Sequence, residues 1–134
     1  MEYLIGAILA VSVSIFAAVV GLDRDRAFYP TVLTVVASYY GLFAVLGGST
    51  EALVAESAVM VVFVAATVLG FRRNLWIVAA GLFAHGVFDF FHGGFIPNPG
   101  LPAWWPAFCM TYDVVAAACL GGLLRASRIR ATAT

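Results

Sequence analysis

Residues 1–22 read MEYLIGAILAVSVSIFAAVVGL, and Glu2 is the one charged side chain among them. A helix needs about 20 mainly apolar residues to cross the hydrocarbon core of a bilayer, so this stretch predicts a transmembrane span at residues 3–22. It lacks the basic start of a signal peptide, and its apolar run is longer than the apolar core of one. We therefore expect the segment to be retained as the first span.

The composition of the whole chain extends this prediction. Of the 134 residues, 63% are hydrophobic and 10% are charged, and the mean hydropathy is +1.02. A soluble domain has about 25% charged residues, so a water-soluble fold could not bury this much apolar surface. Net charge is zero, and the chain has no lysine and no basic stripe with interleaved aromatic residues. This argues against nucleic-acid binding.

Four more apolar segments are long enough to span a bilayer. Turn-forming or charged residues separate them, among them DRDR at 23–26 and the proline-rich GGFIPNPGLPA at 93–103. The fold class is therefore predicted to be all-α, a single domain over residues 1–134 with five transmembrane helices. The spans are expected at residues 3–22, 29–47, 52–71, 75–92 and 105–124.

The basic residues predict how the bundle lies in the membrane. With five spans and an external N-terminus, the internal segments are 23–28, 72–74 and 125–134, and they hold all seven arginines. Positively charged residues collect on the cytoplasmic side. We expect the N-terminus outside, the C-terminus in the cytoplasm, and a multi-pass location in a bacterial cytoplasmic (inner) membrane.

All acidic and histidine side chains inside the spans fall in the outer half of the bilayer. At a rise of about 1.5 Å per residue, they lie within about 12 Å of the outer surface, as do Tyr39, Tyr40 and Tyr112. A charged side chain that faces lipid costs about 2.5–3.5 kcal/mol, so these groups should point into the bundle. We expect a polar cavity lined by spans two to five and open to the outside. The acidic and histidine residues are Glu56, His85, Asp89, His92 and Asp113.

His85, Asp89 and His92 share one face of the fourth span. At about 100° per residue, Asp89 lies about 40° from His85, and His92 lies about 20° from it on the other side. We expect His85, Asp89, Asp113 and Glu56 to form the catalytic core of the site. His92 and Tyr39 are second choices, and Tyr112 is a further supporting residue.

Three interpretations of this site compete, and the first is a metal centre. The pattern HxxxDxxH presents imidazole and carboxylate ligands one turn apart. His85 and His92 are about 10.5 Å apart along the helix axis, too far to hold one ion with relaxed rotamers. Asp89 with one histidine, completed by Glu56 or Asp113, would hold a divalent transition metal such as zinc, iron or manganese. The other histidine would then support a ligand.

The other two interpretations need no metal. The groups could form an acid–base pair or proton relay in an enzyme or a proton-coupled carrier, because imidazole titrates near neutral pH. Alternatively, they could hydrogen-bond to one another and to Tyr39 or Tyr112 to hold the helices together, although such bonds contribute only about 0.6 kcal/mol each.

Four residues are expected to lie outside the site or at its edge. Glu51 follows Ser49 and Thr50 at a helix start, where a carboxylate favours the helix dipole, so we expect a solvated cap. His92 could be interfacial, donating to carbonyl groups of the following loop. Cys109 and Cys119 lie about 15 Å apart along one helix and are expected to be packing residues.

The runs HGVFDFFHG (85–93) and NPGLPAWWPAFCMTYD (98–113) resemble a family of small bacterial multi-span integral membrane proteins of unknown function. The resemblance covers the last two spans and their loop, and it implies a multi-span membrane protein without an assigned activity.

Two characterised groups of membrane proteins also place histidines and acidic residues within the membrane, and this chain resembles them in that respect. Alkaline-ceramidase-like membrane hydrolases use an intramembrane zinc held by histidines, with a serine and an aspartate beside it. This chain has two histidines where that pattern needs three. The pair His85 and Asp89 is similar to that of sterol-isomerase-like proteins, which place a histidine and an acid one turn apart in a membrane cavity.

The leading hypothesis is a membrane-embedded, metal-assisted enzyme that acts on a small or lipid-like molecule. The ion would polarise a substrate oxygen or activate a water, and a carboxylate or histidine would move the proton. The alternatives are a proton- or cation-coupled binding or transport protein and a non-catalytic helper subunit of a membrane complex. The expected partners are the lipid bilayer and a small or lipid-like ligand, and a homo-oligomer is left open.

Overall fold

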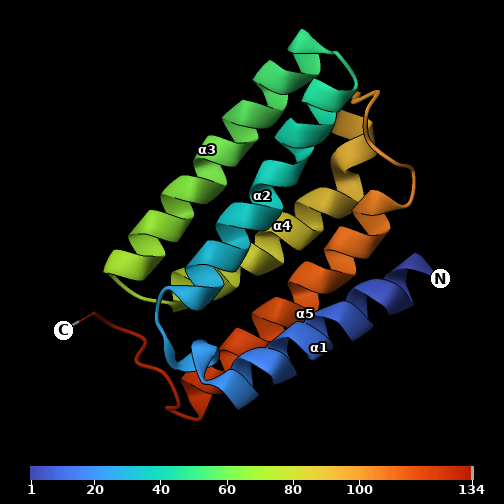
Figure 1. Cartoon of the computed structure of the whole chain (residues 1–134). Helices are drawn as coiled ribbons and strands as arrows, with labels where there is room; N and C mark the ends of the chain where they lie inside the picture. The colour runs from blue at the N-terminus through green and yellow to red at the C-terminus, as the bar shows by residue number, and fades with distance from the viewer. Residues whose placement is uncertain (134) are drawn as a thin grey trace.

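The computed structural model describes residues 1–133 and forms an all-α bundle within them (Figure 1). A short 3₁₀ helix, η1 (Leu22–Arg24), joins the first two long helices. Five helices in this part of the chain are long and apolar enough to cross a membrane, which confirms that prediction. They are α1 (Glu2–Val20), α2 (Phe28–Leu46), α3 (Thr50–Arg72), α4 (Trp76–Phe95) and α5 (Trp105–Arg125).

The helix boundaries follow local sequence signals. α1 ends at Gly21, whose φ of 90° lies in the left-handed region that glycine tolerates. The Ser49 hydroxyl accepts a hydrogen bond (3.1 Å) from the backbone of the first turn of α3, and Glu51 is exposed beside it, as predicted. The largest difference from the predicted boundaries is in α4. It continues to Phe95, so His92 lies inside the helix and not at its end.

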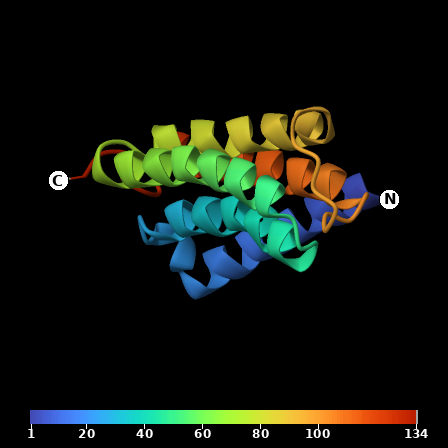
Figure 2. The same cartoon turned by 90° about the horizontal axis from the view of Figure 1, so that it is seen from above.

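α5 lies between two neighbours and packs against α1 on one side and α4 on the other (Figure 1). α2 packs mainly against α3, and both also contact α4 (Figure 2). Gly6 of α1 faces the Phe108 carbonyl group so closely that a Cβ atom there would overlap it. At Gly86 of α4, a Cβ atom would lie 3.1 Å from the Met110 carbonyl oxygen. Small residues therefore let α5 approach both neighbours closely.

The outer surface of the bundle is strongly apolar. In α1, only 17% of the residues in an apolar stretch of membrane-spanning length are buried, and the same share is buried in α3. Large side chains such as Ile15, Phe16 and Val62 are more than half exposed. Apolar surface on this scale would be unfavourable in water and matches a surrounding of lipid chains. The fold is therefore that of a multi-pass membrane protein.

The two ends of the bundle differ in chemistry. We call the end with the 47–49 turn and the 96–104 loop the loop end. We call the opposite end the arginine end, because all seven arginines lie in or beside its segments 21–27, 73–75 and 126–133. Met1 lies at the loop end, and the last turn of α5 lies at the arginine end (Figure 1).

The arginine half of the bundle has an aliphatic core. Leu33, Val78, Leu82 and Leu120 are fully buried there. Arg26 closes this end, because its guanidinium group donates to the carbonyl oxygens of Phe71, Arg130 and Ala131. The segment after α5 is thereby fastened across the ends of α2 and α3.

Candidate functional site

The predicted polar side chains converge in the half of the bundle next to the loop end. Each is at most 2% exposed, so all five point into the bundle, as the cost of exposing them to lipid predicts. The structure differs from the expected open cavity, since the group is enclosed by the surrounding helices. The enclosed residues are Glu56 on α3, His85, Asp89 and His92 on α4, and Asp113 on α5.

Four buried side chains, His85, Asp89, Cys109 and Asp113, form what we call the deep cluster. His85 Nδ1 lies 2.5 Å from Asp113 Oδ2 and 3.5 Å from Asp89 Oδ2. Cys109 Sγ lies 4.0 Å from Asp113 Oδ2. One donor atom from each of the four residues lies within 4.8 Å of the others. The i, i+4 spacing on both α4 and α5 places these pairs on facing surfaces, and the small Gly86 lets the two helices approach.

Tyr40 of α2 connects the deep cluster to the loop end. Its hydroxyl group donates to Asp89 Oδ1 at 2.5 Å. Its ring stacks on the His92 imidazole, with centroids 4.1 Å apart and planes inclined by 12°. Tyr40 is buried, so this hydrogen bond is shielded from competing solvent.

The second polar group consists of Glu56 and His92, and we call it the outer pair. His92 Nε2 lies 2.6 Å from Glu56 Oε1. The Asn98 side-chain amide donates to the same Glu56 oxygen and to the Tyr40 carbonyl oxygen, both at 3.1 Å. The alternative that His92 donates to carbonyl groups of the following loop is therefore wrong. His92 is fully buried within α4 and its Nε2 pairs with Glu56 of α3.

The two polar groups differ in charge balance. The outer pair has one imidazole for one carboxylate, whereas the deep cluster has one imidazole for two carboxylates. No arginine in residues 1–133 lies within 4.0 Å of any of these acids. Both groups contain buried atoms without a hydrogen-bond partner among the described residues: Asp89 Oδ2 and Asp113 Oδ1 in the deep cluster, and Glu56 Oε2 and His92 Nδ1 in the outer pair. The groups differ in charge, because a buried carboxylate needs a cation or a proton and the single imidazole of the deep cluster can neutralise only one of its two carboxylates. The deep cluster is therefore incomplete as a set of protein groups.

The deep cluster has the composition of a metal site. Cysteine sulfur, histidine nitrogen and carboxylate oxygen are all ligands of zinc, and the presence of sulfur disfavours magnesium and calcium. Of the five metal ligands predicted from sequence, His85, Asp89 and Asp113 lie together here. Glu56 and His92 lie outside this group and bind each other.

The supporting tyrosines lie elsewhere than expected. Tyr39 packs edge-on against Trp105, with centroids 5.1 Å apart. Tyr112 packs near Phe108, with centroids 6.5 Å apart. Neither hydroxyl group hydrogen-bonds to the acids or histidines in the described part of the chain, and it is the adjacent Tyr40 that does so.

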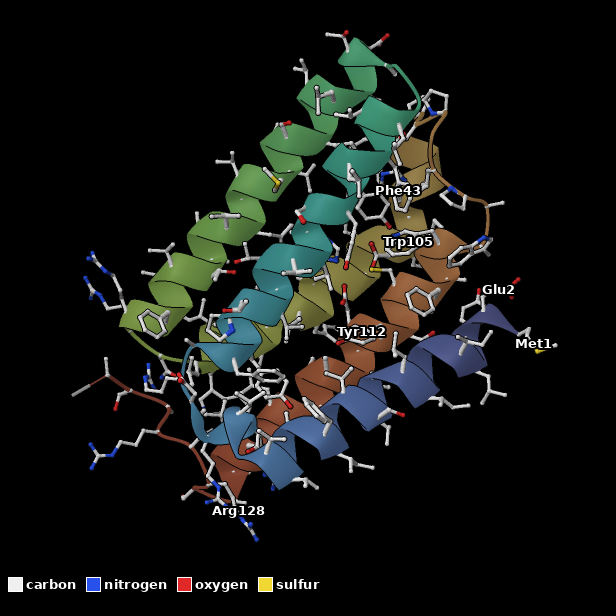
Figure 3. All side chains as sticks on the ribbon, in the orientation of Figure 1. Met1, Glu2, Phe43, Trp105, Tyr112 and Arg128 are labelled. Atoms are coloured by element: carbon white, nitrogen blue, oxygen red, sulfur yellow. The ribbon has the colours of Figure 1, made fainter. Side chains whose placement is uncertain are left out.

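Tyr39 and Tyr112 instead line a groove between α1, α2 and α5, which we call the aromatic groove. Its cavity volume is about 330 Å³ and its walls are mainly apolar. Trp105 and Tyr112 lie on the side of α5 that faces α2 (Figure 3). Cys109 is part of both the groove lining and the deep cluster. The groove therefore leads from the lipid-facing surface to one ligand position of the cluster.

Sequence reasoning missed three residues of the site. Cys109 was expected to be a packing residue, but it lies one turn from Asp113, and that i, i+4 spacing could have revealed it. Tyr40 continues the buried face of α2 formed by Leu33 and Ala37, so helical phase favours it over Tyr39. Asn98 lies in a proline-rich loop, where no periodicity predicts the direction of a side chain.

Comparison with known proteins gives no further assignment: no protein family, curated protein or solved structure matches the chain.

Proposed function

We propose that this chain is a membrane-embedded, metal-assisted enzyme that acts on a lipid-like molecule. The observation that carries the proposal is the deep cluster, in which four buried donor atoms lie within 4.8 Å of one another and one imidazole serves two carboxylates. A divalent cation would neutralise the excess negative charge and bind the unpartnered oxygens of Asp89 and Asp113. Zinc fits this donor set best, and iron or manganese are the alternatives.

The roles of the residues follow from their positions. His85, Asp89 and Asp113 are the permanent ligands, and the Tyr40 hydroxyl orients the Asp89 carboxylate by its 2.5 Å hydrogen bond. A catalytic metal site keeps one position for water or substrate. Cys109 would be the fourth ligand, and it alone of the four lines the aromatic groove, so water or substrate from the groove would reach the ion beside the Cys109 sulfur. A bound ion there would polarise a substrate oxygen.

The aromatic groove supports a lipid-like substrate. Its walls are mainly apolar and it opens on the lipid-facing surface, so an acyl or isoprenoid chain could enter without crossing water. The buried Trp105 Nε1–H, which has no acceptor among residues 1–133, offers one donor for a polar group on such a molecule.

Elemental analysis tests the metal centre. Protein purified without chelator should carry about one equivalent of a divalent transition metal, as a preformed buried site requires. Asp89→Asn and Asp113→Asn should lose it. Glu56→Gln is the matched control, because it makes the same chemical change at an equally buried acid that lies next to the other histidine. Metal-free wild-type protein, or metal retained in both aspartate variants, would overturn the proposal.

An activity test follows from the groove. Metal-loaded protein is incubated with a total bacterial lipid extract, and the lipids are compared by mass spectrometry with those from an Asp113→Asn sample. We expect at least one lipid species to change mass with wild-type protein alone. Identical lipid profiles would favour a binding or helper role over an enzyme.

A second candidate function, a proton relay, is favoured by two hydrogen-bonded segments that lie side by side. One joins Asn98, Glu56 and His92, and the other joins Tyr40, Asp89, His85 and Asp113. The segments meet where the Tyr40 ring stacks on the His92 imidazole, so a relay needs a water molecule to carry the proton between them. The path stops at the aliphatic core of the arginine half, so proton transfer across the membrane requires the helices to rearrange there. In liposomes that contain a pH-sensitive dye, a relay predicts proton uptake that Tyr40→Phe and Glu56→Gln both abolish. Uptake unchanged in these variants would exclude it.

We further propose that the loop end faces the outside and the arginine end the cytoplasm of a bacterial cell. The concentration of arginine at one end supports this orientation. A reporter fused to the C-terminus should be active in the cytoplasm, and a tag before Met1 should be accessible from the periplasm. The reverse result would place the deep cluster in the cytoplasmic half of the membrane.

A further inference from the structure

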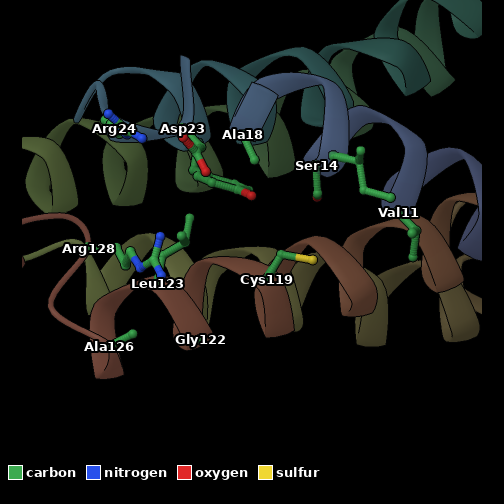
Figure 4. Close-up of a pocket in the computed structure, with 12 residues that line it drawn as sticks. Val11, Ser14, Ala18, Asp23, Arg24, Cys119, Gly122, Leu123, Ala126 and Arg128 are labelled. Atoms are coloured by element: carbon green, nitrogen blue, oxygen red, sulfur yellow. The ribbon is translucent and has the colours of Figure 1, made fainter. Parts of the chain in front are cut away.

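The second region of interest lies at the arginine end, in a cavity between α1 and α5 that we call the α1–α5 cavity. Its volume is about 430 Å³. Figure 4 shows that Arg24, Asp23 and Arg128 lie at one end of it and Val11 at the other. The lining therefore has a charged end close to the arginine-rich segments and an apolar end that extends along the spans.

Two guanidinium groups and one carboxylate line the charged end. Arg24 follows the Gly21 turn in η1, and Arg128 follows Ser127, whose φ of 54° ends α5 and turns the chain. Neither arginine forms an ion pair within 4.0 Å in the described residues. Both are exposed, so they are available to an anion that enters the cavity.

Asp23 adds a buried carboxylate to the two arginines of the cavity lining. It is 7% exposed and lines the cavity, and its Oδ1 atom has no hydrogen-bond partner within residues 1–133. A buried carboxylate without a hydrogen-bond partner destabilises the folded state, so a hydrogen-bond donor on a bound molecule would be favourable at this atom. The donor that neutralises it best is an ammonium group.

We propose that the α1–α5 cavity binds the headgroup of an ethanolamine phospholipid. The phosphate group pairs with Arg24 and Arg128, and the ammonium group donates to Asp23. The acyl chains lie along the apolar lining of Val11, Ile15 and Ala18. The cavity is large enough for a headgroup and the first chain carbons, and the rest of the lipid stays in the bilayer.

Charge complementarity selects this headgroup over two others. Phosphatidylglycerol, whose headgroup is a glycerol, presents the phosphate but has no cation for Asp23. Choline phospholipids have a cation without an N–H group, so they cannot donate a hydrogen bond. Basic pockets between helices on the cytoplasmic side are a known way to bind phospholipid headgroups. This site lies at the opposite end of the bundle from the deep cluster and does not depend on what that cluster holds.

Native mass spectrometry of the detergent-purified full chain tests the proposal. The protein is titrated with phosphatidylethanolamine, phosphatidylcholine and phosphatidylglycerol that share the same acyl chains. We expect the ethanolamine lipid to be retained best. Arg128→Gln should weaken retention of all three about fivefold, as the loss of one arginine near a lipid surface predicts. Arg73→Gln, an arginine outside this lining, is the control and should change nothing.

Asp23→Asn tests the specific headgroup. It should remove the preference for ethanolamine over choline lipid while phosphate binding remains. Ala18 is exposed and lines the cavity near Asp23 (Figure 4), so Ala18→Phe should fill the space beside the charged end and reduce retention of all lipids without changing the thermal melt. The proposal therefore does not depend on Asp23→Asn folding. Equal retention of the three lipids by the wild type, or wild-type retention in Arg128→Gln and Ala18→Phe, would overturn the proposal.

Discussion

The deep cluster and the outer pair both combine carboxylate and imidazole groups at similar burial, yet they differ in how far these groups neutralise each other. Glu56 and His92 can satisfy each other's charge, and Asn98 adds a donor to the carboxylate. In the deep cluster, His85 must serve both Asp89 and Asp113. The ratio of imidazole to carboxylate, more than the number of polar groups, therefore marks the position where a ligand is expected.

The largest expected effect concerns the outer pair. Glu56→Leu should destabilise the protein by about 3–5 kcal/mol, because it leaves His92 buried without its partner. The double variant Glu56→Leu/His92→Leu should recover most of that loss, since a buried pair can be replaced by apolar groups at little cost. Unfolding in a denaturing detergent measures both. A double variant no more stable than Glu56→Leu would show that the outer pair is not a self-contained unit.

The next effect concerns the deep cluster and zinc. At about one hundred times its dissociation constant, zinc should stabilise the wild type by about 2.7 kcal/mol through preferential binding to the folded state. Asp113→Asn should show no such shift in the thermal melt, whereas Glu56→Gln should retain it. Loss of the shift in Glu56→Gln would abolish the distinction between the two groups.

A smaller effect is expected at the contact that brings α4 and α5 together. Gly86→Val should cost about 1–3 kcal/mol, because its side chain would crowd the Met110 carbonyl and Val114. It should also lower the metal content by separating His85 from Asp113. Gly93→Val on the same helix is the control, since a Cβ atom there has no other group within 4 Å. Equal metal content in both variants would indicate that the cluster tolerates helix displacement.

The smallest effect concerns the residue between the two groups. Tyr40→Phe removes the hydrogen bond to Asp89 and keeps the ring that stacks on His92. Hydrogen bonds between membrane helices average about 0.6 kcal/mol and reach about 1.7 kcal/mol, and the loss should fall in this range. Tyr39→Phe, which alters the neighbouring groove, should leave stability unchanged. A larger loss in Tyr39→Phe would contradict the assignment of Tyr40 to the site.

Much of the fold could be predicted from the sequence because lipid imposes strong constraints. A spanning helix requires a minimum apolar length, so the five spans were predicted close to their observed boundaries. A charged group in lipid is costly, so Glu56, Asp89 and Asp113 could be expected inside the bundle, where the structure places them. Both arguments depend on properties of single helices.

Partner choice could not be predicted, because it depends on how helices rotate and tilt against one another. Helical periodicity places His85 and His92 on one face of α4, and this can be predicted from the sequence. The packing of the helices decides that His85 pairs with Asp113 and that His92 pairs with Glu56. A rotation of α2 by one residue would exchange Tyr39 for Tyr40.

The sequence alone determined that this is an all-α chain with five apolar helices and acids and histidines buried in one half of the bundle, because helix periodicity and the cost of polarity in lipid act locally. The tertiary structure alone decided that the face of α5 with Cys109 and Asp113 meets His85 and Asp89 of α4, and that Asn98 folds back onto Glu56. Those contacts join segments far apart in the chain, and close packing at Gly86 and in the 96–104 loop sets them.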